Sequence, residues 1–264
     1  MALMEVNFFS KTLNIATSCY VILPQQAQGI GKEGSEAKEK YPVLYLLHGA
    51  SDDHTIWLRR TSIERYVSTM GLAVVMPDGK LSNYENMEKG GRFRDFIVDE
   101  LPSVMESMFP ISDRPEDRHL AGLSMGGFGA LKNGLLFPEK YATIGILSSG
   151  NFFYGETAKE NFLSRRAGGR IPMSVAIYGN NDWGSMQGTD RDPFVIGEKD
   201  LAEGKKMPRF FHVCGTEDGL LGSARSTRDW FLNHPAISYE YHEGPGSHNW
   251  AFWDQWIQEY LKFI

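Results

Sequence analysis

A serine between two glycines is the residue in this chain that could most readily act as a nucleophile. Residues 122–126 read Gly-Leu-Ser-Met-Gly, a G-x-S-x-G pattern centred on Ser124. Residues 119–121 before the pattern read as a short strand, and the small residues 126–136 after it read as a helix. At such a junction the serine occupies a sharp, strained turn that exposes its hydroxyl. In a chain with 28 glycines, this pattern alone is weak evidence for a catalytic serine. The evidence becomes stronger if the chain also carries a matching base and acid.

A histidine and an acid follow the serine in the order that this chemistry requires. A serine hydroxyl needs a histidine to accept its proton and an acid to orient that histidine. In sheets of this kind the chain order is serine, acid, histidine, on loops that follow strands. Asp218 follows the predicted strand 209–215, and His248 follows the predicted strand 237–242. We therefore predict a catalytic triad of Ser124, Asp218 and His248.

The alternative acids and bases have less favourable positions in the sequence. Glu217 adjoins Asp218, and Asp182 lies in an irregular stretch. The remaining histidines fall inside predicted strands, before a proline or in an early loop, and we expect them to be packed or solvated. They are His48, His54, His119, His212, His234 and His242.

The oxyanion that forms when a serine attacks an ester carbonyl needs two fixed hydrogen-bond donors. Removing one such donor costs about 3–4 kcal/mol in comparable sites. We expect one donor to be the backbone N–H of Met125, the residue after the nucleophile. The second is expected to be the N–H of Ala50, in the loop that follows the apolar run 42–47. In that loop Gly49 permits close backbone approach, and we interpret His48 as shaping the loop. Both residues are also candidates for contact with a bound substrate.

Short apolar runs alternate with stretches of helical spacing along the rest of the chain. Such runs are typical of strands buried on both faces. The predicted strands are 13–23, 42–47, 72–76, 119–121, 141–147, 173–178, 209–215 and 237–242. The predicted helices are 62–70, 94–109, 126–136, 223–231 and 249–264, and Pro102 is expected to bend or restart the second of them. The alternation predicts an α/β fold with a mostly parallel sheet, covered by helices on both faces.

Residues 151–207 break this alternation. We interpret them as a cap-like insertion within a single domain of residues 1–264, and a long surface connection is the alternative interpretation. Trp183 in this stretch and Trp250 at the start of the last helix could flank a bound acyl or sugar group. The same two side chains could instead be packing residues.

Composition and missing motifs exclude several functional classes. The net charge of −6 argues against a nucleic-acid surface. No apolar run approaches a membrane span, and the N-terminus lacks the features of a signal peptide, so we expect a cytoplasmic protein with no membrane contact. Neither a metal-ligand cluster nor a phosphate-binding loop is found in the sequence, which predicts no metal and no cofactor. Cys19 and Cys214 are expected to be buried thiols, with a disulfide as the alternative, and homo-oligomer formation stays open.

Several motifs, in order along nearly the whole chain, make it similar to a known family. They are Leu46-Leu47-His48-Gly49 with Trp57 downstream, Val75-Met76-Pro77-Asp78, Glu100-Leu101-Pro102, residues 121–127, Gly215-Thr216-Glu217-Asp218 and Gly246-Ser247-His248-Asn249-Trp250. These motifs resemble the esterase D and S-formylglutathione hydrolase-like serine esterases, above all the bacterial tributyrin esterases. The resemblance implies an α/β-hydrolase fold and a triad of Ser124, Asp218 and His248. It also implies oxyanion donors at Ala50 and Met125.

The early loop departs from the formylglutathione hydrolases, which tend to carry Ser-Gly-Leu where this chain has His48-Gly49-Ala50. That departure favours small carboxylic esters over glutathione thioesters. We therefore expect a serine carboxylesterase that hydrolyses short-chain or small acyl esters, including acetyl or feruloyl esters of carbohydrates, through an acyl-enzyme. The alternatives are a thioesterase of the S-formylglutathione hydrolase type and an acyltransferase. A non-enzymatic binding protein is disfavoured because the predicted triad is complete.

Overall fold

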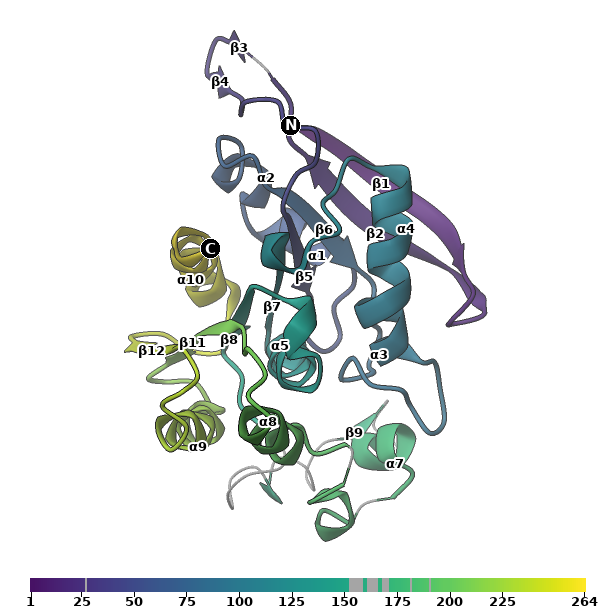
Figure 1. Ribbon diagram of the computed structural model, residues 1–264, viewed down its shortest axis with the longest axis vertical. Coiled ribbons are helices and arrows are strands. Elements are labelled where there is room, and N and C mark those ends of the chain that lie inside the picture. The colour runs from purple at the N-terminus through teal and green to yellow at the C-terminus, as the bar shows by residue number, and fades with distance from the viewer. Residues whose placement is uncertain (27, 152–158, 161–165, 168–170, 181, 190) are drawn as a thin grey trace.

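An eight-stranded sheet forms the centre of the molecule, with the strand order β1-β2-β6-β5-β7-β8-β11-β12 (Figure 1). The computed structural model describes residues 1–26, 28–151, 159–160, 166–167, 171–180, 182–189 and 191–264. The strands of the sheet are β1 (Ala2–Ser10), β2 (Ile15–Leu23), β5 (Val43–Leu47), β6 (Ala73–Pro77), β7 (Arg118–Leu123), β8 (Thr143–Leu147), β11 (Arg209–Gly215) and β12 (Tyr239–Gly244). Every pairing from β6 to β12 is parallel, whereas β1 and β2 join antiparallel. The prediction of a mostly parallel sheet is therefore confirmed.

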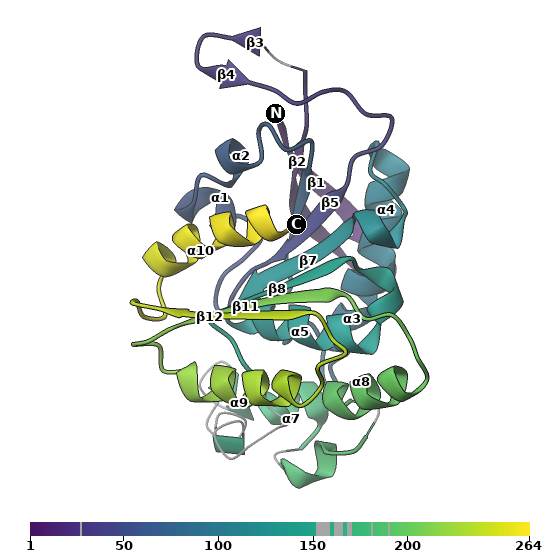
Figure 2. The ribbon, with the colours of Figure 1, turned by 60° about the vertical axis from the view of Figure 1, so that its left-hand side comes forward.

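Helices cover both faces of this sheet (Figure 2). One face carries α1 (Ile56–Arg60), α2 (Ile63–Tyr66) and α10 (Trp250–Phe263), whose apolar side chains share one core cluster. The other face carries α3 (Phe93–Asp95), α4 (Leu101–Met108), α5 (Met125–Leu136) and α9 (Leu221–Leu232), with α7 (Met173–Tyr178) and α8 (Pro193–Ala202) alongside. The central strands β5, β6, β7 and β8 are buried at every residue, as continuous apolar runs between two helical layers should be.

The smaller elements complete the described chain. Two short ribbons pair β3 (Gln28–Gly29) with β4 (Lys32–Glu33), and β9 (Arg166–Ala167) with β10 (Ile171–Pro172). Short 3-10 helices span Pro115–Asp117, Pro138–Lys140 and Gly184–Met186. Within the described residues, no helix has the length and apolar character needed to cross a membrane.

The structure corrects one predicted strand and refines two predicted helices. Residues 173–178 form the helix α7 rather than the predicted strand. The prediction was wrong because a short apolar run that is buried on most sides shows no periodicity that distinguishes a helix from a strand. The predicted helix 62–70 is limited to α2. The predicted helix 94–109 is interrupted by a π-helix at Phe96–Glu100 and restarts as α4, with Pro102 in its first turn as expected.

Much of the predicted insertion at 151–207 lies outside the described residues. Its last helix, α8, packs on α5 and places Phe194 against Trp230 of α9, with ring centroids 4.7 Å apart. This end of the segment therefore belongs to the helical layer of the main fold.

The expectation of buried thiols is confirmed, since Cys19 and Cys214 are both free and buried.

Candidate active site

Ser124 occupies a strained turn between β7 and α5. Its backbone has φ 51° and ψ −115°, a conformation that costs a non-glycine residue about 1–3 kcal/mol and tends to mark functional sites. The two glycines of the pattern permit this turn. A Cβ on Gly122 would lie 2.5 Å from the carbonyl carbon of Gly126, and a Cβ on Gly126 would lie 2.6 Å from the carbonyl oxygen of Leu47. A methyl group at either position would therefore displace the turn.

A continuous hydrogen-bond chain joins the serine, the histidine and the acid predicted from the sequence. The Ser124 hydroxyl lies 2.9 Å from His248 Nε2. On the other side of the ring, Nδ1 lies 2.9 and 3.1 Å from the two carboxylate oxygens of Asp218. Because a carboxylate only accepts, Nδ1 carries the proton and Nε2 is left to accept from the serine. The structure thus brings together residues that follow three different strands.

Burial and hydrogen bonding act in opposite directions on the pKa of Asp218. Its side chain is fully buried, and burial alone would raise the pKa of the carboxyl. The hydrogen bond from His248 and a 2.8 Å bond from the backbone N–H of Leu220 stabilise the charged form, and the pKa lies below its ordinary value. The carboxylate is therefore ionised at neutral pH, where it can stabilise a histidine cation.

Glu217, the neighbouring acid, is engaged elsewhere. Its backbone N–H donates to the carbonyl of Gly246 at 3.0 Å, and its carboxylate accepts from the N–H of the same glycine. Thr216 adds a third bond, from its N–H to the carbonyl of Gly244 at 2.9 Å. Glu217 thus joins the loop of Asp218 to the loop of His248. The other alternative acid, Asp182, is exposed and accepts from the N–H of Gly184 at 3.0 Å.

Two backbone N–H groups without an acceptor follow the neighbouring strands β5 and β7. Strands β5 and β7 are parallel neighbours, and Leu47 pairs with Gly122, so Ala50 and Met125 follow these strands at matching positions. Within the part of the chain that the structure describes, neither the N–H of Ala50 nor that of Met125 has a hydrogen-bond acceptor. Free N–H groups beside a nucleophile are what an oxyanion requires.

His48 is held within the backbone of the loop between β5 and α1. Its Nε2 accepts from the N–H of Gly79 at 2.8 Å, and its Nδ1 lies 2.7 Å from the carbonyl of Gly49. A ring that accepts at one nitrogen and donates at the other is neutral. The Tyr84 hydroxyl donates to the carbonyl of His48 at 2.9 Å, so this loop is fixed by both the side chain and the main chain of His48.

The two predicted substrate-binding tryptophans differ in their surroundings. Trp250 packs edge-on against Trp57 and Trp253, with ring centroids 5.2 and 5.1 Å away. Trp183 is partly buried against the core, and Lys159 lies over its ring at 5.7 Å. Trp250 is therefore part of an aromatic group beside the candidate site, because its neighbour Trp253 contacts His248.

Sequence reasoning missed two aromatic residues that contact the site. Trp253 lies edge-on to His248 with ring centroids 4.9 Å apart, and its position on the helix that follows the histidine could have suggested this contact. Tyr84 lies in an irregular stretch that carries no periodic signal.

Two histidines that we expected to be packed or solvated, His119 and His212, are buried, and burial lowers the pKa of each to about 4.

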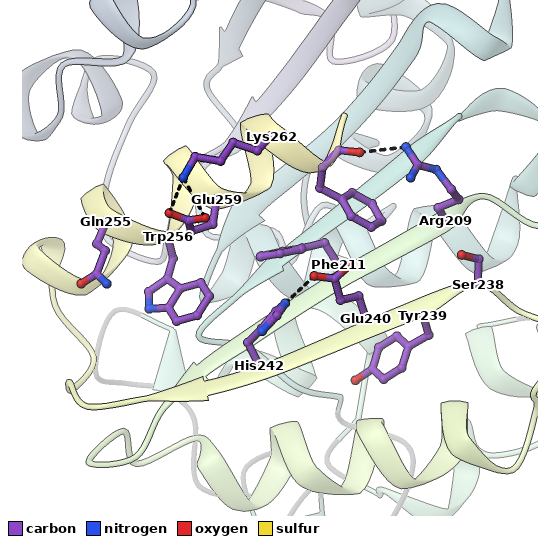
Figure 3. A pocket seen from close by; sticks show the side chains of 11 residues that line it. Arg209, Phe211, Ser238, Tyr239, Glu240, His242, Gln255, Trp256, Glu259 and Lys262 are labelled. Atoms are coloured by element: carbon purple, nitrogen blue, oxygen red, sulfur yellow. Dashed lines mark hydrogen bonds and ion pairs between the residues drawn. The ribbon is translucent and has the colours of Figure 1, made fainter.

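A groove between α10 and the edge strand β12 lies away from Ser124 (Figure 3). It has a volume of about 850 Å³, and Arg209 and Tyr239 in its lining begin β11 and β12. The groove therefore extends toward the amino ends of the strands, whereas Ser124 and Asp218 follow carboxyl ends. His242 in this groove pairs with Glu240 at 2.6 Å rather than with a nucleophile.

Among the described residues, no group of His, Cys, Asp and Glu could hold a metal ion.

Comparisons with known proteins cover nearly the whole chain. The family model described as "Putative esterase" matches residues 10–264. An acetyl esterase of Caldicellulosiruptor saccharolyticus is 32% identical over 265 residues, which span 100% of this chain and 98% of that protein.

Two solved structures from Staphylococcus aureus are similar in both sequence and fold. The fluorophosphonate-binding serine hydrolase FphF has a TM-score of 0.84 and 33% identity, over 99% of this chain and 97% of its own. The S-formylglutathione hydrolase FrmB has a TM-score of 0.82 and 33% identity, over 99% of this chain and 98% of its own. The sheet and helices described above are those of the α/β-hydrolase fold. The chain therefore belongs to the esterase family matched over residues 10–264, and it is a carboxylic ester hydrolase.

Proposed function

We propose that the protein is a serine carboxylesterase for short-chain and small acyl esters, with Ser124, His248 and Asp218 as its catalytic triad. The observation that carries the proposal is the unbroken chain of hydrogen bonds from the serine hydroxyl to a buried, ionised carboxylate. The free N–H groups of Ala50 and Met125 support it, since they are the donors that an oxyanion would require.

In the first half of the reaction, the Ser124 oxygen forms a bond to the ester carbonyl carbon while its proton passes to His248 Nε2. The carbonyl oxygen becomes an oxyanion that the N–H groups of Ala50 and Met125 bind. When the tetrahedral intermediate collapses, the bond to the alcohol oxygen breaks and His248 returns the proton to that oxygen. The alcohol leaves, and the acyl group remains on Ser124.

In the second half, His248 accepts a proton from water as the water oxygen attacks the acyl-enzyme. The second tetrahedral intermediate collapses, His248 protonates the serine oxygen, and the carboxylic acid leaves. Asp218 keeps the proton of His248 on Nδ1 throughout and stabilises the cation that forms in each half. An alcohol in place of water would turn the same intermediate into an acyl transfer.

The acyl group that we propose is small, with acetyl esters of carbohydrates as the first candidates. The similarity to an acetyl esterase over the whole chain supports this choice, as does the early loop with Ala50. A thioesterase of the S-formylglutathione hydrolase type is the second candidate, because FrmB is equally similar to this chain at 33% identity. We further propose that the chain is a single domain and that residues 151–207 form a cap-like insertion, whose part before α8 helps to select the substrate.

A panel of substrates tests this proposal. We expect kcat/KM to be highest for p-nitrophenyl acetate and butyrate, to fall for octanoate, and to be substantial for an acetylated xylo-oligosaccharide. Feruloyl esters and S-formylglutathione complete the panel, and adding an alcohol acceptor detects transfer. A kcat/KM for S-formylglutathione that exceeds every oxygen ester by tenfold or more would replace the proposed substrate class with the thioester.

A further inference from the structure

A fully buried ion pair involves the helix that follows Ser124, and the proposed triad does not use it. Lys132 is on α5, the helix that begins at Met125, and its side chain is completely buried. Its Nζ donates to Glu85 at 2.6 Å, to the carbonyl of Tyr84 at 2.9 Å and to the carbonyl of Asn83 at 3.4 Å. Burying two charges is costly unless other interactions compensate for it, so a pair in this position calls for a reason.

The ammonium group binds a turn of unusual backbone conformation. Asn83 and Tyr84 both have positive φ, 52° and 53°, although neither is a glycine. Such a turn persists only when its surroundings hold it. Lys132 donates to the carbonyl groups of both residues and to the side chain of the next residue, Glu85, which Arg94 also approaches at 3.6 Å.

We define the oxyanion loop as residues 48–50. The turn 83–85 positions the Tyr84 side chain against this loop. The ring is fully buried and is enclosed on two sides by glycines, since a Cβ on Gly79 or Gly129 would lie 2.2 or 2.6 Å from it. Its hydroxyl donates to the carbonyl of His48 at 2.9 Å. That carbonyl belongs to the peptide directly before Gly49, and its orientation constrains the peptides that lead to the N–H of Ala50.

We propose that Lys132 and Glu85 are positioning residues for the oxyanion loop and that they act through Tyr84. Lys132 fixes the turn 83–85, the turn fixes the Tyr84 ring, and the Tyr84 hydroxyl fixes the His48 carbonyl. Helix α5 then fixes the positions of both oxyanion donors. It carries Met125 as its first residue, and it acts on Ala50 through Lys132 and Tyr84. Because an oxyanion hole depends on donors held to a fraction of an ångström, loosening this connection should weaken binding of the transition state more than binding of the substrate. The proposal rests on the proposed function of Ser124, Ala50 and Met125.

Tyr84→Phe tests the connection most cleanly, because it removes only the hydroxyl and keeps the buried ring. We expect kcat for p-nitrophenyl acetate to fall by tenfold or more, KM to change by less than twofold, and the rate of fluorophosphonate labelling of Ser124 to fall in parallel. Tyr141→Phe is the matched control, because Tyr141 is also buried and its hydroxyl has no hydrogen-bond partner among the described residues. That control should retain the wild-type kcat.

A double-mutant cycle then tests whether Lys132 acts through Tyr84. Lys132→Met combined with Glu85→Gln removes both charges, so that neither remains buried without a partner, and should lower kcat as Tyr84→Phe does. Adding Tyr84→Phe to this pair should cause little further loss, because effects along one path are not additive. If the Lys132 variant does not fold, the Tyr84→Phe and Tyr141→Phe comparison decides alone.

A folded Tyr84→Phe with the wild-type kcat overturns the proposal, and so does a cycle in which the losses are fully additive. Either result is distinct from a failure of the proposed function. That function is judged separately, by whether the wild-type protein hydrolyses the ester and Ser124→Ala does not.

Discussion

Glu217 and Gly246 exchange two hydrogen bonds, one through the backbone of Glu217 and one through its carboxylate. These bonds join the loop that carries Asp218 to the loop that carries His248. The backbone bond to Gly246 lowers the pKa of the Glu217 carboxyl, so the connection holds at neutral pH. A residue that sequence reasoning treats as a rival acid therefore positions two residues of the proposed triad.

The first prediction follows from this connection. Glu217→Ala removes the carboxylate that holds Gly246, and the loop of His248 gains freedom. We expect kcat to fall by about tenfold, since a small misplacement of a catalytic group is costly, while the thermal midpoint changes little. Glu116→Ala, at another exposed glutamate, is the control and should retain full activity. Unchanged kcat in Glu217→Ala would mean that the loops hold each other without this side chain.

Asp218→Asn gives the second prediction. The amide keeps the shape of the carboxylate but can donate to Nδ1, which favours the tautomer of His248 with its proton on Nε2. That tautomer cannot accept from Ser124, and comparable triads lose about 10⁴-fold in kcat. The measurement is the steady-state rate for p-nitrophenyl acetate. A loss of less than tenfold would show that Asp218 does not orient His248.

The third prediction concerns the contact between the oxyanion loop and the turn that carries Ser124. A Cβ on Gly126 would lie 2.6 and 2.7 Å from the carbonyl oxygens of Leu47 and His48, so Gly126→Ala should push the oxyanion loop away from Ser124. We expect kcat to fall by about 10²-fold, by analogy with the loss of one oxyanion donor. Gly197→Ala on α8 is the control, since its Cβ would meet only side-chain atoms, at 3.3 Å or more. Full activity in a folded Gly126→Ala would contradict the proposed role of the loop.

The fourth prediction is a loss of stability in mild acid. His212 is completely buried, with Nε2 2.8 Å from the carbonyl of Ser149 and Nδ1 2.8 Å from the Tyr239 hydroxyl, and burial lowers its pKa from 6.5 to about 4. Between these values the unfolded chain takes up a proton that the folded protein does not, so stability falls as the pH falls through this window. The difference corresponds to about 3 kcal/mol.

Thermal melting between pH 7.5 and 4.5 measures this effect. We expect a fall of the midpoint by roughly 6–12 °C from His212 alone, and the buried His119 should add to it. His212→Gln should be less stable than the wild type at pH 7.5 but should show a flatter dependence on pH. An equally steep dependence in this variant would assign the effect to other groups.

The parts of the fold that could be predicted are those with a strong local pattern. The continuous apolar runs at 42–47, 72–76 and 209–215 became buried parallel strands. β1 was not predicted, because its exposed face carries the apolar residues Leu3 and Phe9, which obscure the alternation of an edge strand. The run 173–178 was predicted with the wrong period, because six residues are too few to separate a strand from a helix.

The site could be predicted as far as it depends on chain order and strand ends. Ser124, Asp218 and His248 follow β7, β11 and β12, and the parallel sheet brings these ends to one edge. Lys132 and Tyr84 could not be found in this way, because their contact depends on a turn of positive φ in an irregular stretch. A helical lysine gives no sign in the sequence that it will be buried.

The most direct test of the central claim compares the wild-type protein with Ser124→Ala. Both are assayed with p-nitrophenyl acetate and incubated with a serine-reactive fluorophosphonate, and circular dichroism verifies that the variant is folded. We predict that the wild type hydrolyses the ester and is labelled on Ser124, whereas the variant is unlabelled and loses activity by about 10⁴-fold or more. Equal hydrolysis by the two proteins would contradict the account.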